Sequence, residues 1–268
     1  MGERGSFVLI GLTHRIERQF AELQSRHGRK KSPFCLCEGV RCCGELLNSP
    51  AASSVTLAVI SEKLRCGFEF PESCDVVQVS DDKLQKLSGT VTSQGILLLL
   101  RRPSVRPEDF PAPADPFIIA VDQLGDPGNF GTILRTARAA GLREFWFTAG
   151  SADAYAPKVI RSSLAAQFSM QLREFADLDE LRQFAERCNY KNFFLTDPHC
   201  GESCFECEAL FDRSVVVIGS EAHGIESSAA GSRVTIPMPG NFESLNAAQA
   251  ATIVLFEHVR RLTAGGKK

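Results

Sequence analysis

The sequence lacks a long apolar run, an excess of one charge and an export signal. A membrane-spanning helix needs about 20 consecutive apolar residues, whereas the longest apolar stretches here, such as 96–100 and 215–218, have the length of a strand. The 30 basic and 32 acidic side chains give a net charge of −2, so bulk charge does not indicate a polyanionic partner. The apolar segment 7–12 is short and no small-residue cleavage pattern follows it, which excludes a secretory signal peptide. We therefore expect a cytoplasmic protein without a membrane span.

The composition is that of a folded globular chain. Apolar residues make up 44% and charged residues 23% of the 268 residues, which excludes a disordered, collagen-like or fibrous protein. A chain of this length forms roughly two domains of about 150 residues each, or one large domain. Because there is no export signal, the ten cysteines are expected to be free thiols in a reducing compartment rather than a disulfide framework.

A proline-rich stretch marks the expected domain boundary. Residues 101–116 hold five of the thirteen prolines. Proline fixes φ and removes a hydrogen-bond donor, so this segment is a stiff connector. We predict a basic N-terminal helix or arm over residues 1–30, a small domain over 31–101, a linker over 102–116 and a second domain over 117–268.

The N-terminal segment combines an apolar face with a cationic run. Ile16, Phe20 and Leu23 stand at helical spacing, which predicts an amphipathic helix, and residues 26–31 are densely basic. The cationic run is either solvated or an arm that contacts phosphates. Strand and helix patterns then alternate and predict a small α/β domain in which nothing looks catalytic. The predicted strands cover 34–37, 55–60, 75–79 and 96–100, and the predicted helices cover 40–47 and 81–87.

The C-terminal part alternates more strongly between apolar strand patterns and helix patterns. Buried strands joined by helices predict a parallel sheet with helices on both faces. Such sheets bind ligands in the loops beyond the carboxyl ends of their strands. The predicted strands cover 117–121, 144–148, 168–172, 192–196, 215–218 and 234–236, and the predicted helices cover 131–140, 156–166, 178–188 and 245–262.

The loop after the first of these strands is rich in glycine and runs into a helix. The spacing of Gly125, Gly128 and Gly131 differs from the G-x-G-x-x-G of dinucleotide sites, which disfavours a nicotinamide cofactor. Arg135 and Arg138 stand three residues apart and share a helix face. They are therefore either exposed surface arginines or ligands of a phosphate.

Two further loops carry polar residues directly after strands. Residues 219–224 contain Glu221, placed for function or as a helix cap, and His223, either a base or a structural side chain. Near the C-terminus, Ser244 is the expected N-cap of the last helix. Asn246 stands at the start of that helix, where it can hydrogen-bond a ligand or another loop.

A histidine and three cysteines offer a candidate metal site. His199, Cys200, Cys204 and Cys207 are residue types that bind zinc, and C-x3-C-x2-C is also the spacing of an iron–sulfur motif. That motif normally precedes most of a barrel of roughly 200 residues or more, and the chain beyond Cys207 is too short for one. We therefore expect free thiols on a loop and no bound metal.

Taken in order, the three loops resemble the SpoU/TrmH branch of the SPOUT methyltransferases. The matching strings are DPGNFGTILRTA at 126–137, IGSE at 218–221 and IPM followed by SLN between 236 and 246. The strings CEGVR at 37–41 and SQGI at 93–96 look like the small substrate-binding domain of many members. The resemblance covers about residues 30 to 262. It implies an α/β fold with a C-terminal parallel-sheet domain containing a deep trefoil knot, and a small N-terminal α/β substrate-binding domain.

The resemblance also implies a function and a set of roles. Members are homodimers whose active site forms at the subunit interface, with S-adenosyl-L-methionine as methyl donor and a ribose 2′-hydroxyl of structured RNA as acceptor. Carried over by position, the catalytic residues are Asn129, Arg135, Glu221, Ser244 and Asn246. The donor-binding residues are Thr196, Asp197, Gly219, Ser220, Gly224, Ile236, Met238 and Leu245. The expected RNA-binding residues are Arg26, Arg29, Lys30, Lys31, Arg41 and Arg138.

The chain departs from the family pattern at one place and leaves the RNA open. Ala222 and His223 stand where the family commonly has a glycine after the acid, which affects the fine shape of the pocket. Arginine loses its proton only at a large cost, so we expect Arg135 to align a phosphate or polarise the hydroxyl. The N-terminal domain and its basic segment favour ribosomal RNA over transfer RNA. A resistance methyltransferase and a non-catalytic RNA-binding or assembly protein are the alternatives.

Overall fold

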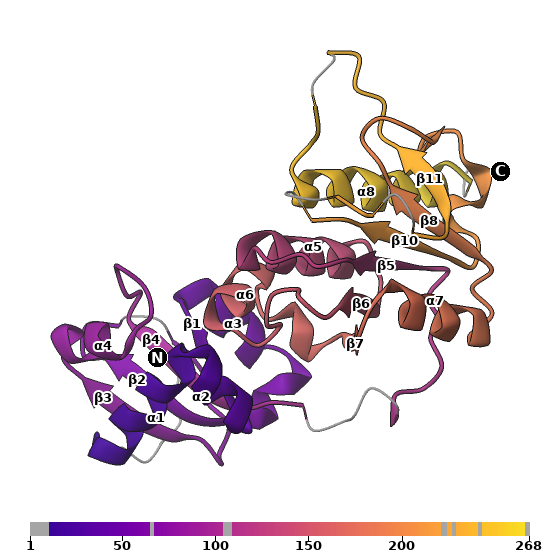
Figure 1. The fold of residues 1–268 in the computed structure, drawn as a ribbon. Helices are drawn as coiled ribbons and strands as arrows, with labels where there is room; N and C mark the ends of the chain where they lie inside the picture. Colours follow the sequence, from indigo (N-terminus) through magenta and orange to yellow (C-terminus); the bar gives the residue numbers. More distant parts are fainter. Residues whose placement is uncertain are drawn as a thin grey trace. The chain divides into compact units, whose positions relative to one another are not determined.

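The chain forms two compact units. The computed structural model describes residues 11–64, 67–103, 109–220, 224–226, 229–240 and 243–265. Unit 1 consists of Met1–Ser104 together with Asp153–Ser169, and unit 2 consists of Val105–Ala152 together with Met170–Lys268 (Figure 1). Residues 153–169 lie within the predicted second domain, 117–268, but belong to the first unit.

Unit 1 is built on a four-stranded sheet. Its strands are β1 (Phe34–Glu38), β2 (Val55–Ser61), β3 (Asp75–Val79) and β4 (Ile96–Arg101), in the order β1-β4-β2-β3. β4 is antiparallel to β1 and β2, and β3 is parallel to β2. The helices are α1 (His14–Gln24), α2 (Arg26–Lys31), α3 (Val40–Leu47), α4 (Asp81–Leu87) and α6 (Pro157–Ser163), with 3-10 turns η1 (Pro50–Ser54) and η3 (Ala166–Phe168).

Alternating side chains bury both faces of this sheet. On one face, Phe20 and Leu23 of α1 pack with Leu84 of α4 against the sheet, which confirms the predicted amphipathic helix. On the other face, the residues of α3 are joined by Ile160 of α6. Ile160 is fully buried, so unit 1 completes its core with a side chain that lies far along the sequence.

The α6 segment also corrects two predicted boundaries. The helix predicted over 156–166 ends at Ser163, because Leu164 and Ala165 adopt the left-handed conformation with φ of 50° and 61°. A left-handed residue cannot continue a right-handed helix. The strand predicted over 168–172 is found three residues later, as β7 (Gln171–Phe175).

Unit 2 is a seven-stranded sheet in which every recorded strand pair is parallel, as predicted. The strand order is β7-β6-β5-β10-β8-β11-β9. Besides β7, the strands are β5 (Phe117–Val121), β6 (Glu144–Thr148), β8 (Asn192–Thr196), β9 (Glu202–Ser203), β10 (Ser214–Ile218) and β11 (Ser232–Thr235). β9 is too short to give a pattern in the sequence and was not predicted.

Helices cover both faces of this sheet (Figure 1). They are α5 (Pro127–Ala139), α7 (Leu178–Arg187) and α8 (Ala247–Gly265), with a 3-10 turn η4 (Glu208–Phe211). Phe130 of α5 packs edge-on against Phe145 and Phe147. Trp146, which points to the opposite face of β6, shares a core with Leu181 of α7. No helix in the described part of the chain is long and apolar enough to cross a bilayer.

β11 lies between two strands that are neighbours in the sequence, β8 and β9. The chain therefore leaves β8, turns through Gly201 into β9, and later returns to place β11 in the space between them. Gly201 has φ of +113°, and a Cβ at this residue would lie 2.4 Å from the carbonyl group of Arg233. This insertion is compatible with the trefoil knot that the family resemblance implies, and the knot stays a prediction.

The close approach at Gly201 predicts an unusually damaging substitution. Gly201→Ala adds a backbone clash to the strain of a positive φ, so we expect it to lower the free energy of unfolding by more than about 3 kcal/mol. Gly141→Ala is the matched control, because Gly141 has φ of +91° but open space around its Cβ position. That control should cost about 1 kcal/mol. Equal losses in urea titrations of the two variants would show that the close approach adds nothing.

Candidate active site at the strand ends of unit 2

Three loops enclose a cavity at the carboxyl ends of β8, β10 and β11. The cavity has a volume of about 580 Å³, which is within the range of small-molecule sites. The start of α8 adds Ala247 and Ala250 to its lining, and the cavity is open to solvent. In an α/β sheet this is the edge at which ligands are expected.

All eight residues that the resemblance assigns to donor binding line this cavity. They come from three separate segments of the chain, which the strand order brings to one place. They are Thr196, Asp197, Gly219, Ser220, Gly224, Ile236, Met238 and Leu245.

The loop after β8 contributes a hydroxyl and a carboxylate. The Thr196 hydroxyl donates to the carbonyl of Val217 at 2.9 Å and so ties β8 to β10. The carboxylate of Asp197 accepts hydrogen bonds from the backbone N–H of His199 at 2.8 Å and of Cys200 at 3.1 Å. Burial alone would raise the pKa of Asp197, but these hydrogen bonds outweigh it and the pKa is lowered. Asp197 is therefore a negative charge held at the cavity wall at neutral pH.

Two described residues of the loop after β10, Ser220 and Gly224, lie close together. Ser220 and Gly224 form an isolated antiparallel bridge, with the N–H of Gly224 donating to the carbonyl of Ser220 at 2.9 Å. A Cβ at Gly219 would lie 2.7 Å from the backbone of Gly224 and 2.8 Å from the side chain of Ile225. Only glycine fits this position. Glu221 and His223 lie outside the residues that the structure describes.

The third loop leads into α8, and here the structure corrects the predicted cap. The helix begins at Ala247, and the side chain of Asn246 accepts hydrogen bonds from the N–H groups of Ala248 at 2.9 Å and Gln249 at 3.3 Å. These are the bonds of an N-cap residue. Asn246 rather than Ser244 therefore caps the helix, and Ser244 is left exposed on the cavity wall.

Asn246 also connects the third loop to the first motif. Its Nδ2 donates to Oδ1 of Asn129 at 3.2 Å, which joins the first turns of α8 and α5. The carboxylate of Asp126 accepts from the N–H of Asn129 at 2.7 Å and Pro127 opens the helix, so α5 starts four residues before the predicted Gly131. Proline after a capping aspartate is the sequence signal that was missed.

The two arginines of α5 lie elsewhere. Arg135 and Arg138 are exposed, and neither belongs to the described residues that line the cavity. The structure of one chain thus brings Asn129, Asn246 and Ser244 to the cavity region. It leaves Arg135 on the outer face of α5.

The cations expected to bind RNA are exposed with one exception. Arg26, Lys30, Lys31 and Arg41 face solvent in unit 1. Arg29 is 7% exposed, and its guanidinium forms an ion pair with Asp153 at 2.7 Å and donates to two backbone carbonyls. Arg29 therefore anchors α2 within unit 1, and its assignment to RNA binding is withdrawn.

Several cavity residues were assigned no role, although one of them, Ile218, belongs to the IGSE string. Those that sequence reasoning missed are Pro198, His199, Ile218, Ile225, Val234, Glu243, Ala247 and Ala250. Most are apolar and differ in no way from core residues in the sequence. Their position within four residues of an assigned residue is the one signal that could have found them.

The histidine and the three cysteines do not come together as a metal site. Cys204 and Cys207 are buried, whereas Cys200 is exposed and its hydrogen bond to Asp197 raises the pKa of its thiol. Among the residues that the structure describes, no group of three or more His, Cys, Asp or Glu side chains is arranged to hold a metal.

A second cavity of about 560 Å³ lies beside the first and shares Ser220 and Gly224 with it. Asp122, Asp177, Asp179 and Glu226 line this second cavity. Four carboxylates repel a phosphate backbone, so a polyanion is not expected there.

Comparison with known proteins assigns the family. A family model described as "SpoU rRNA Methylase family" matches residues 116–256. The chain belongs to the SpoU rRNA methylase family. A second model, described as an MRM3-like substrate binding domain, matches residues 15–98, which are the strands and helices of unit 1 that precede the linker.

Similar proteins extend over nearly the whole of this SpoU-family chain. It is 26% identical to mitochondrial rRNA methyltransferase 3 of Mus musculus, over 92% of this chain and 72% of that protein. A crystal structure titled as an RNA 2′-O ribose methyltransferase is 28% identical with a TM-score of 0.77, over 96% of this chain and 100% of that one. The fold is also that of the SpoU methyltransferase AviRb from Streptomyces viridochromogenes in complex with AdoMet (S-adenosyl-L-methionine), with 24% identity, a TM-score of 0.76, and coverage of 94% and 99%.

The cap of α8 gives a prediction for this SpoU-family site. Asn246→Ala removes the acceptor for two helix N–H groups and should lower the free energy of unfolding by about 1 kcal/mol. Ser244→Ala, two residues earlier on an exposed position, should change it by less than about 0.5 kcal/mol. Urea titration followed by circular dichroism measures both. A larger loss of unfolding free energy for Ser244→Ala than for Asn246→Ala would mean that Ser244 is the N-cap, as the sequence predicted.

Proposed function

We propose that this SpoU-family protein transfers a methyl group from S-adenosyl-L-methionine to a ribose 2′-hydroxyl of ribosomal RNA. The observation that carries the proposal is the cavity at the ends of β8, β10 and β11, to which all eight expected donor-binding residues contribute. The cavity lies within residues 116–256, which match the family model. The alternative acceptor is transfer RNA.

The cavity suits the methyl donor in its chemistry. Ile236, Met238 and Leu245 supply apolar walls, and Gly219 allows the backbone of Gly224 to pack closely, which sets the shape of the cavity at the β10 loop. The charged carboxylate of Asp197 suits the hydroxyl or ammonium groups of such a ligand. When bound, S-adenosyl-L-methionine supplies a methyl group activated by its positively charged sulfur.

The polar residues beside the cavity are proposed to orient the acceptor. Methyl transfer is an in-line displacement, so alignment of the hydroxyl contributes most, and loss of the hydroxyl proton requires a neighbouring polar group. Ser244 lies on the cavity wall and the Asn129–Asn246 pair lies at the adjoining helix starts. We propose that Arg135 aligns the RNA. Glu221, the acidic residue of the IGSE motif, stays a proposed catalytic residue.

Ribosomal RNA is the preferred substrate for two reasons. The substrate-binding unit, with exposed Arg26, Lys30, Lys31 and Arg41, suits a large structured RNA. The mouse relative is named as an rRNA methyltransferase.

We further propose that two copies of the chain form the active site. Arg135 is exposed on α5, outside the cavity of its own chain. α8 lies beside α5 (Figure 1) and presents Phe256 at 48% and Leu262 at 61% exposure. Contact between two such surfaces would cover these apolar side chains and bring Arg135 to a partner's cavity.

We also retain a reducing compartment, the cytoplasm, as the proposed location, since nine described cysteines are free thiols.

The direct test uses ribosomal and transfer RNA pools from cells in which the gene is deleted. Transfer of labelled methyl to one RNA, followed by mapping of the nucleotide, identifies the substrate and the position of the methyl group. If no RNA is labelled and the donor does not bind, the non-catalytic RNA-binding alternative replaces the proposal.

Gly219→Ala should weaken donor binding at least tenfold, because its Cβ collides with the backbone of the β10 loop and shifts the cavity wall. Isothermal titration with S-adenosyl-L-methionine measures the change. Gly125→Ala is the control, since a Cβ there meets nothing within 4 Å, and its affinity should stay within about twofold of the parent. Unchanged binding by Gly219→Ala would remove the β10 loop from the donor site.

Arg135→Ala should abolish methyl transfer while leaving donor binding intact, because the guanidinium is assigned to the RNA and not to the donor cavity. The variant also tests the shared site when it is co-expressed with Gly219→Ala. In a mixed dimer, one of the two sites combines an intact Arg135 with an intact cavity, so purified mixed dimers should have about half of the parent activity. No recovery in purified mixed dimers would mean that Arg135 serves the cavity of its own chain, and lost donor binding would end the assigned role.

A further inference from the structure

The loop between α4 and β4 in unit 1 presents an apolar side chain to solvent. Val91, in the middle of residues 88–95, is 99% exposed. A single exposed valine is common on protein surfaces. What distinguishes Val91 is the way in which the loop around it is fixed and the charge that lies beside it.

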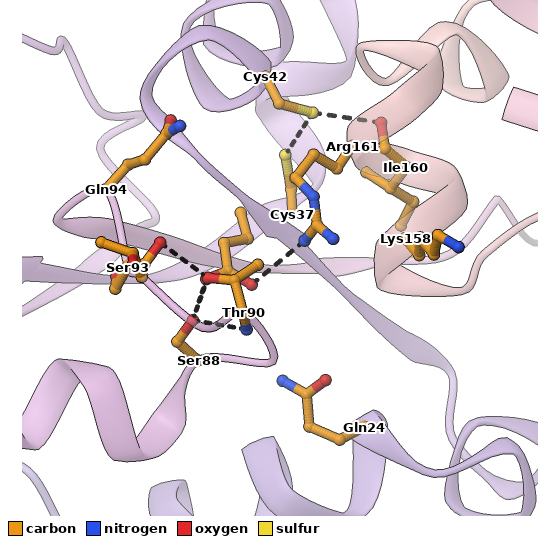
Figure 2. Close-up of polar contacts among 12 residues, drawn as sticks. Gln24, Cys37, Cys42, Ser88, Thr90, Ser93, Gln94, Lys158, Ile160 and Arg161 are labelled. Atoms are coloured by element: carbon orange, nitrogen blue, oxygen red, sulfur yellow. Dashed lines mark hydrogen bonds and ion pairs between the residues drawn. The ribbon is translucent and has the colours of Figure 1, made fainter. Parts of the chain in front are cut away.

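A buried carboxylate anchors the loop. Glu38 stands at the end of β1 and is 2% exposed. Its Oε1 accepts hydrogen bonds from the hydroxyls of Ser88 and of Thr90, the latter at 2.8 Å (Figure 2). Nε2 of Gln85 donates a hydrogen bond to the carbonyl of Thr90 at 2.7 Å, and Oε1 of Gln85 accepts one from the N–H of Ser93 at 2.8 Å. Val91 is therefore carried on a backbone that is held on both of its sides.

The end of the loop is fixed to the start of α3. The side-chain oxygen of Gln94 accepts a hydrogen bond from the N–H of Val40 at 2.9 Å. Arg41, the next residue of α3, is exposed. The loop thus ends beside a cation.

A second source of positive charge comes from α6. NH1 of Arg161 lies 3.7 Å from Oε2 of Glu38, an oxygen that makes no hydrogen bond. Figure 2 shows the Arg161 side chain reaching from α6 toward this loop. The Arg161 side chain is 37% exposed, and Lys158 is exposed three residues earlier on the same helix face. Arg161 balances the charge of Glu38 and still presents part of its guanidinium to solvent.

The opposite side of the loop is also cationic. Nε2 of Gln24, at the end of α1, donates to the carbonyl of Leu87 at 3.3 Å, and the Gln24 side chain lies against Gly89. Arg26 follows two residues later, and Lys86 stands in the last turn of α4; both are exposed. Exposed cations therefore stand on the elements that hold the loop at both of its ends.

We propose that this loop, with Val91 at its tip and Arg161 beside it, contacts an unpaired nucleotide of the structured RNA substrate. The inference rests on the proposed function and names the RNA feature that unit 1 recognises. Val91 would pack on the exposed base or sugar, the Ser93 hydroxyl and the side-chain N–H groups of Gln94 would bind its edges, and the nearby exposed cations would bind the neighbouring phosphates.

The chemistry favours an unpaired nucleotide over the other candidates. The deep major groove of an A-form helix is too narrow for such a loop, and recognition of RNA bases targets loops and bulges. A protein partner would need an apolar patch of interface size. In the described part of unit 1, Val91 is the single large apolar side chain recorded as exposed, so the apolar area is too small.

A binding experiment with defined RNAs tests the tip. The probes are a 20-base-pair RNA duplex and the same duplex with a three-nucleotide bulge, measured by fluorescence anisotropy with the full chain. We expect the parent to prefer the bulged duplex, and Val91→Ala to lose about five- to tenfold in affinity for it, because two buried methyl groups are removed. Affinity for the uniform duplex should not change. Phe205→Ala, at an exposed apolar residue of unit 2, is the control and should bind both probes like the parent.

The salt dependence of binding tests the arginine. If Arg161 contacts a phosphate, Arg161→Ala should reduce the slope of log affinity against log salt concentration by about one. Arg182→Ala is the matched control, because the Arg182 side chain is also 37% exposed but lies on α7 of unit 2. An unchanged slope for Arg161→Ala, or an equal change for both variants, would overturn the role of Arg161.

The activity assay separates this inference from the proposed function. With protein-free ribosomal RNA as substrate, Val91→Ala should raise KM about five- to tenfold with little change in kcat or in donor affinity. If the parent methylates RNA and the variant matches it in KM and in binding to the bulge, the inference alone fails. If the parent methylates nothing, the proposed function fails and the bulge measurements still decide the inference. A defect confined to assembled ribosomal particles would mean that the loop docks on a protein.

Discussion

The pairing of β11 between β8 and β9 positions the candidate site. Backbone hydrogen bonds from Asp197 to Val234 at 2.9 Å and from Cys204 to Thr235 at 2.8 Å hold β11 in this place. Because β11 is parallel to β8, and β8 to β10, the loops after all three strands emerge at one edge of the sheet. The cavity is the space between these loops. A change that displaces β11 therefore acts on the cavity and on the stability of the unit together.

The sequence was most informative where local chemistry and burial agree. The strands β5, β6 and β8 have the predicted bounds, because continuous apolar runs bounded by polar residues are typical of buried parallel strands. The assigned cavity residues came from the family resemblance, and their position agrees with the rule that ligands bind at strand ends. The order of the strands, which brings these segments together, has no local signal and was not predicted.

The predictions that were wrong depended on features that no local sequence pattern shows. Arg29 looked like its neighbours Lys30 and Lys31, but its partner Asp153 lies 124 residues along the chain, and no local pattern shows such a pair. Ser244 and Asn246 are both good capping residues, and only the position of the first helical turn decides between them. The end of α6 depends on two left-handed residues, Leu164 and Ala165, which are neither glycine nor asparagine and so give no warning in the sequence.

Unit 1 takes part of its core from a segment that follows the first two strands of unit 2. Ile160 and the ion pair of Arg29 with Asp153 belong to that segment, and Glu38 meets Arg161 there as well. During synthesis the chain emerges from its N-terminus and domains fold as units when complete. The first hundred residues therefore leave the ribosome without their closing helix, and unit 1 reaches its final packing only after residue 169 has been made. The substrate-binding unit can therefore complete its folding only after part of the catalytic unit has been translated.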